Sequence, residues 1–481
     1  MEKVAIVGAG PGGIVAARFL QSQGFDPVLF EAHDRPGGQW CHDNPASGVW
    51  PMMRTNTARM VTRFSDLDYP AGVAMFPRNQ DVGDHLDSYA ELFGLNAKIR
   101  TGTRLKALEQ MRGGWRLTIE SGGETREETF PRVVIATGAY NRPGIPNEPG
   151  LDGFSGDLGA IHAFDYDTPD AYRGKRVLIA GGNISSLEIA SDLAMLGAAH
   201  VATAMRRQRY VMPKLIAGTP VESYVFTRAA ALFQETASSE EWAEQTKAFV
   251  LQYGGDPVWY GAPAADPDVR RAGTTGSQNF LNLVAEDRIR CHPWIASIED
   301  RTVRFTDGSE DEFDGIIFGT GYRMNLPFLS QALCETLELT DKSITLANHT
   351  FHPDAPGLAF MGLWAQIGPY LPALELQARY LAYSWSSVVP AAEDATLRDA
   401  CARARSERGK DRYQHIQTLR FARLAGCDPE GAVDAPTAAM LAANAVTALS
   451  FRLTGPDALP DAAAQLRAET LRYGRKDQNF A

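Results

Sequence analysis

The sequence predicts an α/β fold with two similar parallel-sheet units, because the order strand, glycine-rich turn, helix, strand occurs twice. The first occurrence begins at residue 3 and the second at residue 175. From about residue 373 to the end the chain is rich in alanine and in helical periodicity. Strands that alternate with helices in this way are typical of parallel sheets covered by helices.

The length of the chain and its net charge limit the number of domains and the kinds of binding partner. The chain has 481 residues, of which 44% are hydrophobic, and a net charge of -11. At roughly 150 residues per domain, this length favours two or three domains. The acidic balance argues against nucleic acid and against anionic membranes as main partners. No apolar run approaches the roughly 18 residues that a membrane span needs.

The cysteines indicate a reduced protein. There are five, at positions 41, 291, 334, 401 and 427, and no two have C-x-x-C spacing. This pattern disfavours a disulfide framework, a zinc site and a dithiol redox centre. A cytoplasmic location without a signal peptide, and a site without a metal, are therefore expected.

The first unit carries a dinucleotide-binding pattern. Residues 3–7 (KVAIV) predict a buried strand, and Gly8, Gly10 and Gly13 fill the G-x-G-x-x-G spacing that follows. A helix to about residue 23 and a strand at 27–31 come next. This strand ends in Glu31, 18 positions after Gly13, where an acid should accept a hydrogen bond from a ribose 2′-OH.

The segment after the first unit predicts a second glycine turn and a meander. PGGQW (36–40) contains a glycine pair that would let the backbone approach a cofactor again, with a simple surface turn as the alternative. Strands at 104–111, 115–120 and 124–130 are separated by glycine pairs, as in a meander. A further strand is expected within 131–138.

The second unit has a degraded glycine pattern. After a strand at 175–180, Gly181 holds the first position, but Asn183 holds the second and Ser186 the third. Asparagine tolerates left-handed geometry and serine is small, so the turn can still form. No acid ends the strand at 200–205. Arg206 and Arg207 follow it instead, which favours NADPH over NADH because they suit a 2′-phosphate; the alternative is solvated arginines.

The remaining segments are less regular. Residues 214–275 predict a helical insertion in the second unit, whose aromatic side chains lie mostly in the core and in part line a substrate pocket. Residues 303–322 predict a hairpin closed at Asp307-Gly308, a buried strand and a Gly-Thr-Gly turn. This last turn resembles the one that ends the strand at 133–138.

Seven segments together resemble the flavin-containing monooxygenases, within the group that also contains the Baeyer–Villiger monooxygenases. They are GAGPGG (8–13), PGGQW (36–40), RTNTARMVTRFSDLDYP (54–70), FPRNQDVGDHLDSYAELFGL (76–95), ATGAYNRPGIP (136–146), GTGY (319–322) and LAFMGLWAQIGPYLPALELQAR (358–379). The resemblance implies two Rossmann-like domains, with an NADPH domain at 168–319 inserted in an FAD domain at 1–167 and 320–481.

The resemblance also implies the site. Asn56 is the catalytic candidate beside the flavin and the nicotinamide, because an amide donates and accepts without adding charge; a turn asparagine is the alternative. The cofactor-binding residues expected for FAD and NADPH are Gly8, Gly10, Pro11, Gly13, Glu31, Gly38, Gln39, Trp40, Thr55, Asn56, Thr137, Gly138, Gly181, Asn183, Ser185, Ser186, Arg206, Arg207, Thr320, Gly321, Tyr322, Gln366 and Leu371.

One motif departs from the family. The family fingerprint F-x-G-x-x-x-H-x-x-x-Y is matched by Phe154, Gly156, His162 and Tyr166, but the interval from Gly156 to His162 is two residues longer. His162 therefore has two interpretations, a site residue or a structural linker histidine. Tyr166 stands where Baeyer–Villiger enzymes typically carry tryptophan, which favours heteroatom oxygenation.

The expected function is NADPH-dependent monooxygenation. In the family, a C4a-hydroperoxyflavin formed from O2 oxygenates a soft nucleophile, so N- or S-oxygenation of a small organic substrate is favoured. The alternatives are Baeyer–Villiger oxygenation of a ketone or aldehyde, and a flavoprotein that only oxidises NADPH or has lost turnover. The sequence does not name the substrate, and it leaves open whether the chain forms a homodimer.

Overall fold

The first parallel sheet contains strands from both ends of the chain. The computed structural model describes residues 1–41, 43–410 and 412–475. The five parallel strands have the order β22-β7-β1-β2-β3. Their bounds are β1 Lys3–Val7, β2 Asp26–Phe30, β3 Ile99–Arg100, β7 Arg132–Ile135 and β22 Leu358–Phe360. The strands predicted at 3–7, 27–31 and 131–138 are confirmed, with Glu31 directly after β2.

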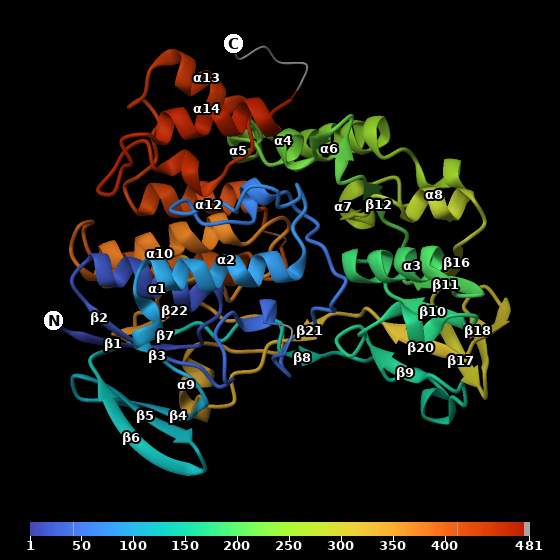
Figure 1. The fold of residues 1–481 in the computed structure, drawn as a ribbon, viewed down its shortest axis with the longest axis horizontal. Helices are drawn as coiled ribbons and strands as arrows, with labels where there is room; N and C mark the ends of the chain where they lie inside the picture. The colour runs from blue at the N-terminus through green and yellow to red at the C-terminus, as the bar shows by residue number, and fades with distance from the viewer. Residues whose placement is uncertain (42, 411, 476–481) are drawn as a thin grey trace.

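Alternate residues of β1 face two different layers. Val4 and Ile6 pack against α1 Pro11–Ser22 and α10 Leu371–Trp385, whereas Ala5 and Val7 pack against an antiparallel meander. The meander is β4 Thr103–Met111, β5 Gly114–Ser121 and β6 Glu124–Phe130, as predicted. Figure 1 shows the helices on one side of this sheet and the meander on the other. The sheet is thus buried on both faces, which explains its continuous apolar strands.

The second parallel sheet is built in the same way. Its order is β16-β11-β10-β20-β9, with bounds β9 Gly159–His162, β10 Arg176–Ala180, β11 His200–Met205, β16 Arg290–Pro293 and β20 Gly315–Phe318. Val177 and Ile179 face α3 Ile184–Leu196 and α8 Phe280–Ala285. Leu178 and Ala180 face the antiparallel strands β17 Ile295–Glu299, β18 Thr302–Phe305 and β19 Glu310–Glu312. The predicted hairpin at Asp307-Gly308 joins β18 to β19.

Two chain crossings join the sheets. β8 Arg142–Pro143 and β21 Tyr322–Arg323 pair with each other between the two sheets (Figure 1). β9 lies before residue 167, where the sequence places the first boundary, yet it pairs with β20 of the second sheet. We therefore propose that the domain boundary falls between β8 and β9, and that the return crossing lies near β21.

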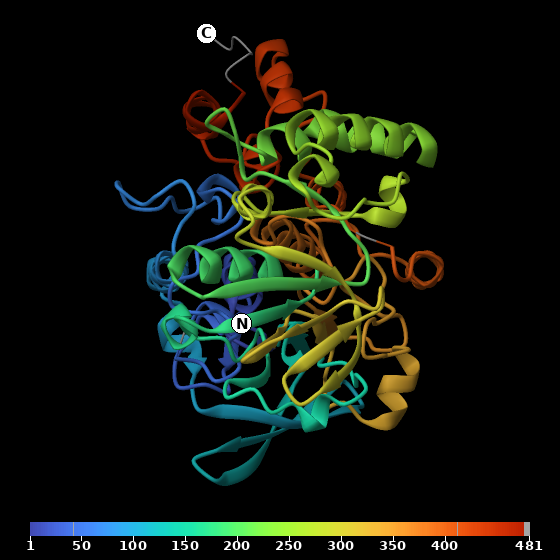
Figure 2. The same cartoon turned by 90° about the vertical axis from the view of Figure 1, so that its right-hand side faces the viewer.

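The insertion and the C-terminal helices pack together. The insertion contains α4 Glu222–Val225, α5 Arg228–Thr236, α6 Ser239–Tyr253 and α7 Val269–Ala272, with the short strands β12 Tyr210–Met212, β13 Leu215–Ile216, β14 Thr219–Pro220 and β15 Thr274–Gly276. α5 contacts both α12 Gln414–Leu424 and α13 Ala435–Ala443. Figure 2 shows these helices on the same side of the molecule. The other helices are α2 Asn79–Leu92, α9 Gln331–Thr336, α11 Asp394–Ser406 and α14 Ala462–Tyr473.

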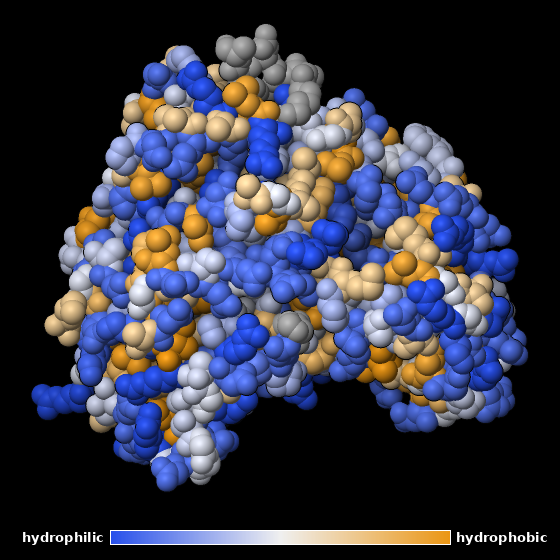
Figure 3. Space-filling model, viewed as in Figure 1, coloured by the Kyte–Doolittle hydropathy of each residue, from blue (hydrophilic) through white to orange (hydrophobic). Residues whose placement is uncertain are grey.

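Among the described residues, no helix combines the length and the apolar character that crossing a bilayer requires. The face drawn in Figure 3 is largely hydrophilic, with hydrophobic residues scattered over it.

Candidate active site

One cavity reaches the glycine turns of both units. Its volume is about 1790 Å³, which exceeds the 300–1,000 Å³ of a typical single-ligand pocket. The predicted residues on its wall are Gly8, Gly10, Pro11, Glu31, Gly38, Gln39, Trp40, Thr55, Asn56, Thr137, Gly138, Asn183, Ser185, Arg207, Gly321, Tyr322, Gln366 and Leu371. The structure therefore brings most of the predicted residues to one space that can hold more than one ligand.

The first glycine turn is tightly packed. Gly8 has φ +102°, and a Cβ there would lie 2.6 Å from the Ala136 carbonyl oxygen. A Cβ at Gly13 would lie 1.9 Å from the Gly8 carbonyl oxygen, so Gly13 sits behind the turn and not on the cavity wall. The turn leaves the N-terminus of α1 facing the cavity, a geometry that suits a pyrophosphate.

The second glycine pair lies against the first turn. The Gly37 amide donates to the Ala9 carbonyl oxygen at 2.9 Å, and a Cβ at Gly38 would lie 3.0 Å from the Gly10 Cα. Gly38 also has φ +60° and begins the short turn Gly38–Trp40 that carries Gln39 and Trp40. Two backbones without side chains thus border the cavity together, which is a cradle for a ligand that approaches closely.

Glu31 is held at the end of β2. One carboxylate oxygen, Oε2, accepts from the Ala9 amide at 2.7 Å, and Oε1 accepts from the His33 amide at 2.9 Å. The side chain is 7% exposed and lines the cavity. Each oxygen keeps a second lone pair, so the carboxylate can also accept from a ribose hydroxyl.

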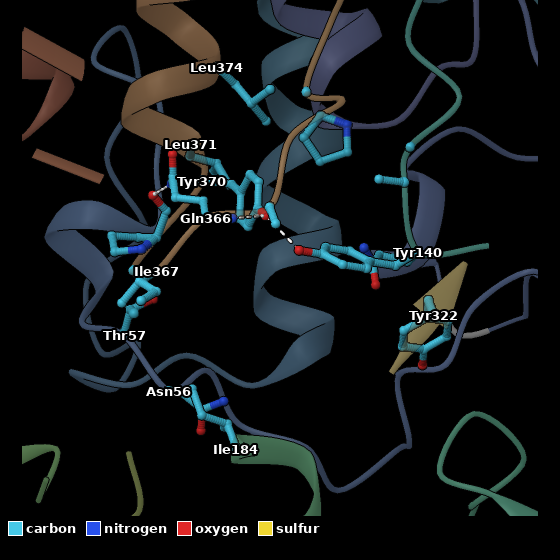
Figure 4. Close-up of a pocket in the computed structure, with 18 of the residues that line it drawn as sticks. Asn56, Thr57, Tyr140, Ile184, Tyr322, Gln366, Ile367, Tyr370, Leu371 and Leu374 are labelled. Atoms are coloured by element: carbon cyan, nitrogen blue, oxygen red, sulfur yellow. Dashed lines mark hydrogen bonds between the residues drawn. The ribbon is translucent and has the colours of Figure 1, made fainter. Parts of the chain in front are cut away.

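Asn56 lies where the two units meet. Figure 4 places it beside Ile184, the first residue of α3, with Gln366, Tyr370 and Leu371 of the first unit across the cavity. Its Oδ1 is buried and has no hydrogen-bond partner among the described residues. The neighbouring Thr55 is fixed, because its amide donates to the Pro77 carbonyl and its hydroxyl to the Thr57 carbonyl. Asn56 therefore follows a residue that is fixed by hydrogen bonds, and its amide oxygen has hydrogen-bonding capacity left for a ligand.

A tyrosine pair and a glutamine border the cavity opposite Asn56. The Tyr370 hydroxyl donates to the Trp364 carbonyl at 3.0 Å and accepts from the Gln366 amide at 2.9 Å. Because its single proton is used, Tyr140 is the donor in the 2.6 Å contact between the two hydroxyls (Figure 4). This network joins the segment after β7 to the start of α10. Nearby, the Thr137 hydroxyl has no partner among the described residues.

The second glycine turn packs against Gly319, a glycine that lies outside the turn. Gly181 and Ser186 do not line the cavity, and the Ser186 hydroxyl donates to the Gly319 carbonyl at 3.3 Å. A Cβ at Gly319 would lie 2.0 Å from the Ser186 Oγ. Asn183 adopts extended backbone with φ −100°, so the left-handed geometry expected as tolerable there is not used. Asn183 and Ser185 line the cavity at the start of α3.

The two predicted arginines lie in different environments. Arg206 is largely exposed, with its guanidinium 4.4 Å above the Trp294 ring and 3.6 Å from Glu148, and it does not line the cavity. Arg207 does line it and donates to the Arg271 carbonyl at 2.8 Å. Arg209 lies on the same wall, and both guanidinium groups lie beside Gly273. Sequence reasoning missed Arg209, and a third arginine close to Arg206 and Arg207 after β11 is the signal that could have found it.

The fingerprint residues border the crossing between the sheets. His162 is buried on the cavity wall, and burial lowers its pKa. Its Nδ1 accepts from the Phe164 amide at 3.0 Å, which leaves the proton on Nε2. Its ring meets Tyr322 edge-on at 5.2 Å, and Tyr166 meets Trp50 at 5.7 Å. Thr320 lies off the wall, where its hydroxyl donates to the Gly144 carbonyl at 2.7 Å.

A family model described as flavin-binding monooxygenase-like matches residues 1–429. The chain belongs to this family. It is similar to flavin-containing monooxygenase 5 of Oryctolagus cuniculus, at 26% identity over 79% of this chain and 72% of the relative. It is also similar to flavin-containing monooxygenase 2 of Homo sapiens, at 26% identity over 87% of this chain and 80% of the relative.

Solved structures share the fold. S-allyl-L-cysteine S-oxygenase from Allium sativum superposes with a TM-score of 0.65 at 22% identity, covering 88% of each chain. A cyclohexanone monooxygenase with bound epsilon-caprolactone superposes with a TM-score of 0.67 at 17% identity, covering 90% of this chain and 99% of that one. The predicted fold of two Rossmann-like units and the predicted family are confirmed, and the chain is a flavoprotein oxidoreductase of the monooxygenase type.

Proposed function

We propose that this protein is an FAD- and NADPH-dependent monooxygenase that oxygenates a nitrogen or sulfur atom of a small organic substrate. The observation that carries the proposal is the single cavity that joins the two nucleotide-binding turns to an aromatic chamber. Within the described residues there is no group of three or more His, Cys, Asp or Glu side chains placed to hold a metal ion. The proposed chemistry uses two organic cofactors, FAD and NADPH.

The first turn fits FAD. The backbone cradle of Gly10 and Gly38 would hold the pyrophosphate at the start of α1, and Glu31 would accept from the adenosine ribose. The unpartnered Thr137 hydroxyl and Asn56 amide oxygen are buried polar groups that a bound ligand would satisfy. When bound, FAD would supply the hydride acceptor and the centre that activates O2.

The second turn fits NADPH. Asn183 and Ser185 at the start of α3 would contact its pyrophosphate, and Arg207 with Arg209 would bind the 2′-phosphate. The nicotinamide would then reach Asn56, which lies beside Ile184 at the beginning of α3. In this position the Asn56 amide would hold the nicotinamide end and the reacting centre in one geometry.

The insertion and the C-terminal helices supply a chamber for the substrate. Its wall includes aromatic side chains from α4 to α6 and from the segment before α12, namely Tyr224, Phe226, Phe233, Trp242, Phe249 and Tyr413. Such a wall excludes water, which limits loss of oxygen as peroxide and favours transfer to a soft nucleophile. The substrate nitrogen or sulfur would present its lone pair to the bound flavin, whose proposed position borders Asn56.

A substrate screen tests this function. Consumption of NADPH is measured with amines, sulfides and ketones, together with product and hydrogen peroxide. We expect an amine or sulfide to accelerate NADPH consumption and to yield about one N-oxide or sulfoxide per NADPH. An ester formed from a ketone would instead support Baeyer–Villiger oxygenation. NADPH consumption matched wholly by peroxide would identify an oxidase and contradict the proposal.

The proposal also includes the location of the enzyme in the cell. The five cysteines, all within the described residues, are unpaired, and three of them are buried. We place the enzyme in the reducing cytoplasm, where free thiols persist and NADPH is available.

A further inference from the structure

Glu222 is a fully buried carboxylate on the cavity wall. It is the first residue of α4 and is 1% exposed. Its Oε1 accepts from the Ala58 amide at 3.0 Å, which joins the insertion to the loop that carries Asn56. Its other oxygen, Oε2, has no hydrogen-bond partner among the described residues. The backbone amide of Glu222 itself also stabilises the charged carboxylate and lowers its pKa. Oε2 therefore keeps hydrogen-bonding capacity that the described side chains do not use.

An unpartnered carboxylate in this position is unfavourable unless something else satisfies it. Burying an ionised group without a partner is far less favourable than leaving it in water. Burial accordingly raises the pKa of Glu222 to about 7. Among the described residues, Lys214 is the charged group that opposes this rise, and its ammonium is paired with Glu188 at 3.0 Å. The remaining capacity of Glu222 thus points to a ligand.

Aromatic side chains on the wall of the same cavity favour a cation as that ligand. Tyr224, which is two residues from Glu222, packs against Phe249 with ring centroids 6.2 Å apart, and the Arg475 guanidinium lies 5.0 Å from the Tyr224 ring centroid. Trp242 packs against Tyr413 at 5.8 Å, and all four rings line the same cavity. Aromatic faces attract ammonium groups through their electron-rich surfaces, and a carboxylate adds a full negative charge. An acid within an aromatic wall is a common arrangement for binding an amine.

We infer that Glu222 determines substrate specificity by binding a cationic group of the substrate, such as an ammonium, while the reacting nitrogen or sulfur lies towards Asn56. This inference rests on the proposed function, which it deepens by naming the substrate class: small amines or sulfides that carry a positive charge. The bond from Oε1 to Ala58 fixes the distance between the charge-binding point and the reacting loop. Neutral substrates of the same shape cannot form this ion pair with Glu222.

A matched pair of ligands tests the inference without turnover. The cationic probe is the methyl sulfide of ethyltrimethylammonium, and the neutral probe is methyl neohexyl sulfide, in which carbon replaces the charged nitrogen. Binding to the FAD-loaded protein is measured by calorimetry at pH 8. We expect the cation to bind about 10-fold or more tightly than the neutral probe, because only the cation can form an ion pair with Glu222; this ratio corresponds to about 1.4 kcal/mol.

A substitution pair assigns the preference to Glu222. Glu222→Gln keeps an acceptor for the Ala58 amide but removes the charge, so the preference for the cation should disappear. Glu244→Gln changes an exposed carboxylate of α6 in the same insertion and should keep the preference. Retained preference in Glu222→Gln would overturn the inference. Flavin content and circular dichroism establish that both variants are folded.

The pH dependence of wild-type binding is a second test that needs no variant. Glu222 is neutral below its pKa of about 7 and charged above it. The permanent cation should therefore bind more weakly as the pH falls from 8 to 6, whereas the neutral probe should not. A ratio of the two affinities that is constant across this range would contradict the inference. Because binding alone is measured, this outcome is separate from a failure to oxygenate.

Discussion

The two glycine turns solve the same packing problem in different ways. In the first unit, glycines of the turn itself stand where the backbone leaves no room for a side chain. A Cβ at Gly13, for example, would lie 1.9 Å from the Gly8 carbonyl oxygen. In the second unit Ser186 occupies the equivalent position, and the neighbouring strand supplies the missing space through Gly319. The glycine that avoids the clash is thus Gly319, which lies 133 positions after Ser186 and outside the turn.

The second turn therefore keeps its geometry although its sequence departs from the G-x-G-x-x-G pattern. Both turns follow the central strand of a five-stranded parallel sheet, and both sheets carry helices on one face and three antiparallel strands on the other. Both turns leave the start of a helix at the same cavity. The first is adjacent to an acid that suits a ribose, and the second is followed by arginines that suit a phosphate.

The largest expected effect is at Gly13. Gly13→Ala forces a methyl group against the Gly8 carbonyl, so we expect destabilisation of about 3 kcal/mol or more and loss of bound FAD. Gly12→Ala is the matched control, because its Cβ would meet Met361 and Leu374 at ordinary contact distances of 3.6 and 3.8 Å. Thermal unfolding and flavin content are the measurements. Equal behaviour of the two variants would mean that the first turn is not limited by packing.

Gly319 tests whether the second turn depends on a distant glycine. Gly319→Ala places a methyl 2.0 Å from the Ser186 Oγ and should destabilise the protein by about 1–3 kcal/mol. Adding Ser186→Gly removes that oxygen and should restore most of the stability. The free energy of unfolding of the two single variants and the double variant gives the coupling. Additive effects would show that the two positions do not compensate each other.

Arg207 and Arg206 test the nucleotide preference of the second unit. Arg207→Ala should raise the KM for NADPH about 10- to 100-fold and leave that for NADH nearly unchanged, because a charge-assisted contact contributes roughly 1.5–3 kcal/mol. Arg206→Ala is the control, since its side chain is exposed and away from the cavity. Steady-state kinetics with both nucleotides distinguish them. A larger effect from Arg206 would reverse the assignment.

Asn56 tests the point at which the two units meet. Asn56→Ala should still accept hydride from NADPH, but product per NADPH should fall and peroxide should rise, since a lost neutral hydrogen bond costs roughly 1 kcal/mol. Asn96→Ala, an exposed position, serves as the control. Product and peroxide are measured in the same reaction. Unchanged coupling in Asn56→Ala would leave Asn56 as a turn residue only.

Local patterns predicted most of the fold. The first strand and helix, the meander, β10, α3, β11 and the hairpin at Asp307-Gly308 all have a clear period or turn residue within the segment itself. β9, β16 and β22 were not predicted. Each has only three or four residues, and their pairing partners are distant in the sequence, so no local period identifies them.

The site was predicted less completely, for related reasons. The resemblance of whole segments identified Asn56 and Gln366, which the structure brings to one cavity. Arg206 and Arg207 lie in a bend after β11, where no regular period fixes which side chain faces the cavity, so the sequence alone could not separate them. Glu222 was missed because its partner, the Ala58 amide, is 164 residues away and only folding brings them together.

The most direct test of the account is the nicotinamide preference of the wild-type second unit. The rate at which NADPH and NADH bleach the flavin absorbance is followed without oxygen, over a range of nucleotide concentrations. Because Arg207 and Arg209 line the cavity that the second turn reaches, we expect NADPH to saturate at a concentration at least about 10-fold lower than NADH. Equal saturation, or a preference for NADH, would contradict it.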